Sequence, residues 1–100
     1  MINPESKFQS DAIEYLKAKN IYCLNLHGDG FGGRGKPDLI ACIGGQFAAF
    51  ELKVGKNTMS DAQKLHKIWI QRSGGLFFSP YTLDEFKSIV DKLEKEALYG

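Results

Sequence analysis

Two apolar segments joined by a pair of glycines carry the residues best suited to chemistry. The segments are Leu39–Ile43 and Gln46–Val54, and the Gly44-Gly45 connection between them is typical of a β-hairpin. A two-residue turn fixes the register of the strands, so that Asp38 lies directly opposite Glu51. The sequence therefore predicts two carboxylates on one face of the hairpin, with Cβ atoms about 5 Å apart.

Lys53 is expected to join this pair. It lies two residues beyond Glu51, so both side chains project from the same face of the strand. Facing carboxylates repel each other, and a divalent cation between them removes the repulsion. Mg²⁺ is commonly held by one or two carboxylates, by waters and by phosphate oxygens of a substrate. A lysine beside such a site orients or helps to deprotonate a water on the metal, so the pattern indicates metal-assisted hydrolysis of a phosphodiester.

A structural interpretation of the same residues stays open. Asp38 follows Pro37 and is also typical of a turn, and Glu51 and Lys53 also suit a solvated strand face. In favour of a shared site, the hairpin register predicts that the acids are close, independently of their residue types. The alternate positions of the second strand are apolar and are expected to face the core: Ala48, Phe50, Leu52 and Val54.

The remaining segments predict an α/β protein in which helices flank a small mixed β-sheet, in the order α-β-β-β-α-β-α. The predicted helices span Glu5–Lys19, Ser60–Arg72 and Thr82–Leu93, and the two other strands span Ile21–Leu26 and Leu76–Ser79. In the second helix, the apolar spacing places Leu65, Ile68 and Trp69 on the face expected to contact the core. These elements are needed to hold the hairpin, because an isolated hairpin is only marginally stable.

The spacing of the acidic residues and the lysine resembles the motif of the PD-(D/E)xK nucleases. Pro37-Asp38 is followed by a gap of twelve residues and then by Glu51-Leu52-Lys53. The runs Gly-Lys-Pro-Asp-Leu-Ile, Phe-Glu-Leu-Lys-Val and Ser-Asp-Ala-Gln-Lys are similar to the VRR-NUC branch, which has small stand-alone members in phages. The resemblance covers roughly Glu5 to Pro80, and the chain departs from it in having no Val-Arg-Arg run, the feature that names the branch.

The resemblance implies a restriction-endonuclease-like core and a structure-specific endodeoxyribonuclease that depends on Mg²⁺ or Mn²⁺. The implied substrate is branched DNA such as a four-way (Holliday) junction. Carried over by position, Asp38, Glu51 and the backbone carbonyl of Leu52 bind the metal, and Lys53 is the catalytic lysine. Glu5 completes the site from the first helix, with Glu14 as the alternative on that helix, and Gln63 supports the site.

A glycine-rich segment, Gly28–Lys36, contains two patterns that are typical of nucleotide binding. Gly28–Gly33 matches G-x-G-x-x-G, and Gly30–Lys36 matches the first seven positions of a P-loop. Both patterns need a helix to follow, whereas here Pro37-Asp38 and a strand follow, so we expect no nucleotide cofactor. The segment is instead predicted to be a loop at the mouth of the site. Four basic residues are expected to contact DNA phosphates: Arg34, Lys36, Lys56 and Lys64. The alternative is that they are ordinary solvated side chains on the surface.

The composition excludes several classes of protein. Thirteen Lys and Arg residues against twelve Asp and Glu give a net charge of +1, which excludes a strongly basic arm or an acidic tail. One hundred residues are enough for one core, which predicts a single nuclease-like domain over residues 1–100. The apolar runs are too short to span a membrane. Cys23 and Cys42 are too few for a disulfide scaffold, so we expect buried thiols in a cytoplasmic protein, of a phage or its bacterial host.

A symmetric cut in two DNA strands needs two active sites, so we expect a homodimer. The third predicted helix has an apolar face, made of Phe86, Ile89, Val90 and Leu93. This face either supplies part of the dimer interface or simply covers the sheet. Two other functions stay open: a non-catalytic DNA-binding module with a nuclease-like fold, and a small interaction protein with no nucleic-acid role. Cleavage of a labelled junction that requires Mg²⁺ or Mn²⁺ distinguishes the nuclease from both.

Overall fold

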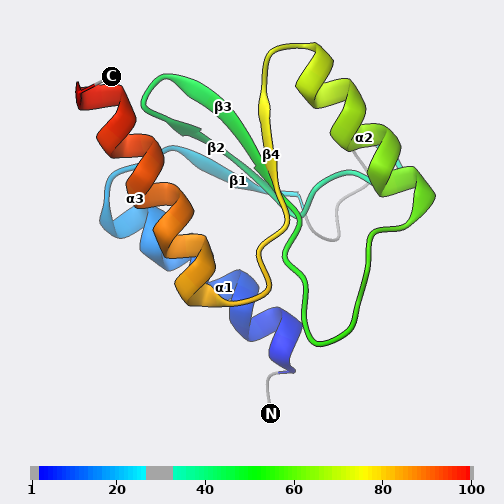
Figure 1. Ribbon diagram of the computed structural model, residues 1–100. Helices are drawn as coiled ribbons and strands as arrows, with labels where there is room; N and C mark the ends of the chain where they lie inside the picture. The colour runs from blue at the N-terminus through cyan, green and yellow to red at the C-terminus, as the bar shows by residue number, and fades with distance from the viewer. Residues whose placement is uncertain (1–2, 27–32, 100) are drawn as a thin grey trace.

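The computed structural model describes residues 3–26 and 33–99, and it has the predicted order of elements (Figure 1). Most of the glycine-rich segment, with its G-x-G-x-x-G pattern and His27, therefore lies outside the described residues. The elements are α1 (Pro4–Ala18), β1 (Cys23–Asn25), β2 (Leu39–Ile43), β3 (Gln46–Phe50), α2 (Asp61–Arg72), β4 (Leu76–Phe78) and α3 (Leu83–Tyr99).

The four strands form one mixed sheet in the order β1-β2-β3-β4. The pairs β1–β2 and β2–β3 are antiparallel, whereas β4 runs parallel to β3 after the crossover through α2. The predicted hairpin register is confirmed over all five pairs, from Ile43 opposite Gln46 to Leu39 opposite Phe50. Gly44 and Gly45 both have positive φ angles, of 59° and 83°, which is the backbone that a two-residue hairpin turn of type I′ requires.

Helices α1 and α3 cover one face of the sheet, and the core lies between them and β2 and β3 (Figure 1). Phe50 of β3 and Phe86 of α3 are fully buried there, with ring centroids 4.8 Å apart. Because Phe86, Val90 and Leu93 are buried in this core, α3 covers the sheet and its apolar face is not available for a dimer interface. The helix also continues six residues beyond its predicted end, to Tyr99.

Helix α2 lies apart from this core, beside β4 (Figure 1). The expectation for its inner face is wrong, because Leu65, Ile68 and Trp69 are 67%, 48% and 70% exposed, and α2 buries none of its residues against the described chain. Apolar spacing predicts which residues share a face of a helix, but not whether another element covers that face.

The cysteines also differ from expectation, since Cys42 is exposed and Cys23 is only partly buried. Cys42 alternates with Ala41 and Ile43, which face the core, so its side chain projects from the opposite face of the sheet. Among the described residues, no helix is both long and apolar enough to cross a membrane.

Candidate active site

The side chains of Asp38 and Glu51 lie close together at the end of the hairpin. The predicted direct pairing of Asp38 with Glu51 is not among the pairs of the ladder, because the Asp38 N–H donates over 3.0 Å to the carbonyl of Phe50, the residue that is paired with Leu39. The Asp38 carboxylate accepts the Leu52 N–H over 2.8 Å, and it is also hydrogen-bonded to the carboxyl group of Glu51. Two carboxyl groups share a hydrogen bond only if one of them carries a proton, and the raised pKa of Glu51 assigns this proton to Glu51.

Glu51 is buried, with 3% of its surface exposed. Burial, the hydrogen bond that protonated Glu51 donates to the Asp38 carboxylate and the negative charge of Asp38 raise the pKa of Glu51 to about 8, and the nearby Lys53 ammonium offsets part of this shift. Glu51 Oε2 is buried and has no hydrogen-bond partner among the described residues. An unsatisfied buried carboxyl oxygen costs free energy, which indicates a position meant for a further ligand.

Lys53 is buried as well, with 7% of its surface exposed. Its ammonium group donates to Gln63 Oε1 over 2.9 Å and to the Thr58 carbonyl over 3.2 Å. The interpretation of Glu51 and Lys53 as a solvated strand face is therefore wrong. Their exposure falls because the chain after β4 covers this segment, where Phe78 and Pro80 carbonyls accept the N–H groups of Glu51 and Lys53.

Gln63 contacts Lys53 from the first turn of α2. Ser60 caps this helix and accepts the Gln63 N–H over 3.2 Å, while Gln63 Oε1 accepts the Ser60 N–H over 2.9 Å, which is a capping box. The oxygen that completes the cap is thus the same oxygen that holds the Lys53 ammonium. The start of α2 consequently fixes the position of the lysine.

The backbone of Leu52 is oriented toward Asp38. Hydrogen bonds alternate along this segment, since Glu51 and Lys53 donate toward the β4 side and Leu52 donates to the Asp38 carboxylate. The N–H and C=O of one residue in extended backbone point to the same side. The Leu52 carbonyl is therefore expected on the side of Asp38, as a metal-ligand role requires.

Residues of α1 approach the site less closely than expected. Glu5 is exposed and its carboxylate accepts a long hydrogen bond, 3.4 Å, from Asn57 in the loop before α2. Glu14 is exposed and lines a groove between α1 and β1. The described residues include no group of three or more His, Cys, Asp or Glu side chains placed to hold a metal, so neither glutamate forms a triad with the hairpin acids.

Gln9 on α1 makes hydrogen bonds to β1 and to the backbone of Asp38, and the sequence interpretation missed it. Its Nε2 donates to the Asn25 side chain over 2.7 Å and to the Asp38 carbonyl over 3.3 Å. Gln9 follows Glu5 by one helical turn and so lies on the same face of α1. That spacing was available in the sequence and could have identified it.

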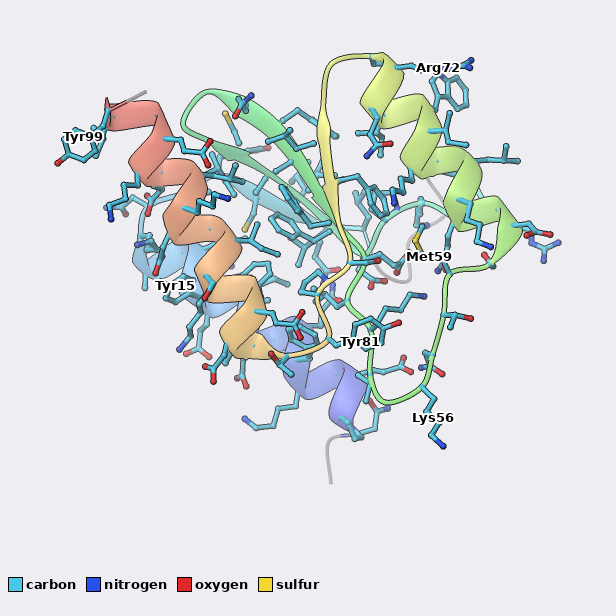
Figure 2. The ribbon with its side chains drawn as sticks, viewed as in Figure 1. Tyr15, Lys56, Met59, Arg72, Tyr81 and Tyr99 are labelled. Atoms are coloured by element: carbon cyan, nitrogen blue, oxygen red, sulfur yellow. The ribbon has the colours of Figure 1, made fainter. Side chains whose placement is uncertain are left out.

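The basic residues are spread over two surfaces. Arg34 is exposed and lies against α2, and Lys64 is exposed on α2 itself. Lys36 is partly buried, directly before Pro37. Lys56 is exposed in the loop between β3 and α2, at the opposite end of the molecule from Arg72 (Figure 2). The four residues predicted to contact DNA therefore flank the buried cluster and do not form one patch.

The donors at the hairpin fit a hard divalent cation. Asp38 and Glu51 provide adjacent carboxyl oxygens, and Glu51 Oε2 is without a partner among the described residues. Two carboxylates are sufficient protein ligands for Mg²⁺, whose other ligands are usually waters and phosphate oxygens. A cation there would also lower the pKa of Glu51, because a neighbouring positive charge favours the carboxylate.

A solved structure of a VRR_NUC domain has this fold. The two chains superpose with a TM-score of 0.76 at 18% sequence identity, covering 90% of this chain and 97% of the other. No family model matches the sequence, and no curated protein matches it either. The chain thus has a nuclease-like fold, that of a VRR_NUC domain, as the resemblance of its motifs predicts.

Proposed function

We propose that this protein is a divalent-metal-dependent endodeoxyribonuclease, and that its hundred residues act as one nuclease domain. The single observation that carries the proposal is the cluster of buried Glu51 and Lys53 with partly buried Asp38, in which Glu51 Oε2 has no partner among the described residues. Burying a carboxyl group and an ammonium beside a second acid is costly in free energy, which a purely structural role would not require. The nuclease-like fold supports this interpretation.

The residues of the cluster take separate parts in hydrolysis. Asp38, Glu51 and the Leu52 carbonyl would hold Mg²⁺ or Mn²⁺, which when bound polarises the scissile phosphate and lowers the pKa of the attacking water. Glu51 gives up its proton to act as a carboxylate ligand. Lys53, fixed by Gln63 and Thr58, orients the water and stabilises negative charge on the phosphate as the phosphorus–oxygen bond breaks.

Branched DNA, such as a four-way junction, is the proposed substrate. The support is the resemblance of the motifs to the VRR-NUC branch and the small net charge of +1, which favours recognition of DNA shape over tight sequence-independent binding to duplex. Glu5 is proposed to assist from α1, and the proposed phosphate contacts are Arg34, Lys36, Lys56 and Lys64.

The test is cleavage of a labelled four-way junction, beside a linear duplex of the same sequence. We expect cleavage of the junction in Mg²⁺ or Mn²⁺ and none in EDTA. Binding of DNA without cleavage of any substrate in Mn²⁺ would instead identify a non-catalytic DNA-binding module. Absence of binding to every DNA at low salt would favour a protein interaction role.

We also propose that the protein acts as a homodimer in the cytoplasm, because two symmetric cuts require two active sites. Sedimentation of the protein with and without a junction measures the mass directly. A monomer that stays monomeric on the junction would contradict the dimer and leave the single-site chemistry intact.

A further inference from the structure

The outer face of α2 carries a surface that the proposed chemistry does not use. Arg34, Leu65, His66, Trp69 and Arg72, which we call the Trp69 surface, line a hollow of about 470 Å³ together with Ala62 and Ile68. Within the described residues nothing covers it, and Arg72 lies at the free end of the helix (Figure 2). Exposed apolar patches of this kind, rimmed by polar side chains, typically mark binding sites.

Trp69 is the centre of this surface. It is the only tryptophan in the sequence and is 70% exposed. The His66 ring lies beside it, with ring centroids 6.5 Å apart and an angle of 47° between the planes. A large aromatic ring on the surface exposes an apolar, π-rich face to water, and a flat ring of another molecule is its best partner.

The charge of the surface indicates which kind of molecule binds. Arg34 and Arg72 give the surface positive charge, and no acidic residue is among the described residues that line the hollow. A second copy packed symmetrically on this face would bring the same positive charges together, which is unfavourable. A polyanion with flat apolar groups is complementary to it in both charge and shape, and single-stranded nucleic acid has both properties.

The surface is connected to the hairpin through the start of α2. A Cβ atom at Gly35 would lie 2.4 Å from the Ala62 backbone, so the chain that leads to Asp38 packs directly on this helix. Gln63, which holds Lys53, precedes Trp69 by six residues, or about 9 Å along the helix axis. That separation corresponds to a few stacked nucleotides, at about 3.4 Å per nucleotide of one strand.

We propose that the Trp69 surface binds an unpaired nucleobase, which stacks on Trp69 while Arg34 and Arg72 contact the flanking phosphates. The substrate class is then DNA with unstacked bases close to the cut, as at a junction, a flap or a strand end. This rests on the proposed nuclease function for its purpose, but the binding itself does not depend on cleavage.

The experiment uses the single tryptophan as its own reporter. The probe is a short oligodeoxythymidylate in EDTA, so that no cleavage occurs, with a blunt duplex of equal length for comparison. Stacking on Trp69 is expected to quench the intrinsic fluorescence saturably, and the single strand is expected to bind more tightly than the duplex. The Trp69 variants contain no tryptophan, so their affinity and that of the parent are compared by fluorescence anisotropy of a dye-labelled strand. Trp69→Ala is expected to weaken single-strand binding about five- to a hundredfold, with Trp69→Phe in between.

Tyr99→Ala is the matched control, because Tyr99 is an equally exposed aromatic residue on α3, on the far side of the molecule from Arg72 (Figure 2). This variant is expected to bind like the parent protein, and unchanged circular dichroism establishes that each variant is folded. Unquenched fluorescence at saturation, or equal affinity of Trp69→Ala, overturns the proposal. So does loss of a dimer in Trp69→Ala, which would make the surface a contact between copies.

The two proposals fail in different ways. Quenching with no cleavage of any substrate in Mn²⁺ refutes the nuclease but supports the stacking site. Junction cleavage that is unchanged in Trp69→Ala, together with unquenched fluorescence, refutes the stacking site and leaves the nuclease intact.

Discussion

Glu51 is the residue whose protonation is most changed by folding. Its carboxyl group is removed from water and lies beside a second acid, and both effects favour the protonated form. The positive charge of the Lys53 ammonium lowers the pKa of Glu51 and so offsets only part of these two effects. The metal-free site is therefore held together by a proton in the position where we propose that a cation binds.

This environment makes the stability of the metal-free protein depend on pH. The pKa of Glu51 is about 8 in the folded state against an ordinary 4.5. At a pH between these two values the folded protein therefore keeps a proton on Glu51 that the unfolded chain has released. The free energy of unfolding is expected to fall as the pH rises from about 4.5 to about 8. Denaturant unfolding in EDTA across this range measures it, with Glu51→Gln expected to remove most of the slope. Glu96→Gln, an exposed glutamate on α3, is the control, and an unaltered slope in Glu51→Gln would contradict the assignment.

Asp38→Asn separates a metal-ligand role from a structural one. The amide can accept the Leu52 N–H and donate to Glu51, so the repulsion between the acids disappears while the hydrogen bonds remain. We expect the metal-free protein to gain about 1 kcal/mol of stability near neutral pH. Mn²⁺ binding, measured by calorimetry, is expected to weaken at least about tenfold. A less stable metal-free variant would mean that the carboxylate of Asp38 is structural.

Lys53→Ala tests the proposed catalytic lysine. Loss of the ammonium is expected to lower junction cleavage by about 10²- to 10⁴-fold with little change in Mn²⁺ affinity. Lys53→Ala also removes the buried alkyl chain, so Lys53→Met, which fills most of that space without the ammonium, is measured in parallel. Lys95→Ala, an exposed lysine on α3 to which no role is assigned, is expected to retain cleavage. Full turnover in both Lys53 variants would remove this residue from the mechanism.

At the scale of elements, α2 has two separate roles. Its first turn is tied to the hairpin, because Gln63 completes the cap with Ser60 and holds Lys53 with the same oxygen. Its later turns extend beyond the core and expose Trp69. The helix thus connects the buried cluster with the surface proposed to bind unpaired bases.

The contact of residue 35 with α2 can be tested with two glycines of similar backbone. Gly33 and Gly35 have φ angles of 70° and 82°, but only at Gly35 would a Cβ atom collide, 2.4 Å from Ala62. Gly33→Ala is expected to cost about 1 kcal/mol of stability from backbone strain alone. Gly35→Ala is expected to cost about 2 kcal/mol more, because α2 must shift, and to lower cleavage as Gln63 moves. Thermal unfolding and junction cleavage measure both, and equal losses in the two variants would contradict the contact.

At the scale of the whole molecule, the near-neutral charge limits how the proposed DNA substrate could be bound. A net charge of +1 provides little general attraction, so the proposed phosphate contacts depend on a few local side chains. Two of the basic side chains, Lys56 and Arg72, lie at opposite ends of the molecule (Figure 2). A bent or branched DNA can contact both ends at once more easily than a straight duplex.

The salt dependence of junction binding counts these contacts. Four phosphate contacts in each copy predict that the logarithm of the association constant falls with the logarithm of salt concentration, with a slope of about −3.6 per copy. Lys56→Ala is expected to make the slope less steep by about 0.9, whereas Lys95→Ala, on α3, leaves it unchanged. Fluorescence anisotropy of a labelled junction in EDTA measures the slope. A Lys56→Ala slope equal to that of the parent protein would exclude this residue from the interface.

The sequence by itself determined the hairpin and what it brings together. A two-residue Gly-Gly turn sets the pairing of strands that are adjacent in the chain, so the approach of Asp38 to Glu51 followed from local geometry. Most helix boundaries followed from capping residues and apolar spacing, which are also local. The supporting role predicted for Gln63 came from family resemblance, and the structure shows that Gln63 accepts a hydrogen bond from Lys53.

Only the tertiary structure decided which of these residues are buried. Glu51 and Lys53 are covered because the chain after β4 lies alongside them, and Gln9 contacts the hairpin because α1 packs across the sheet. Trp69 is exposed because no described element packs on the outer face of α2. Burial and exposure depend on contacts between segments distant in sequence, which no local pattern specifies, and here they decide both the protonation of the acids and the surface left free for a partner.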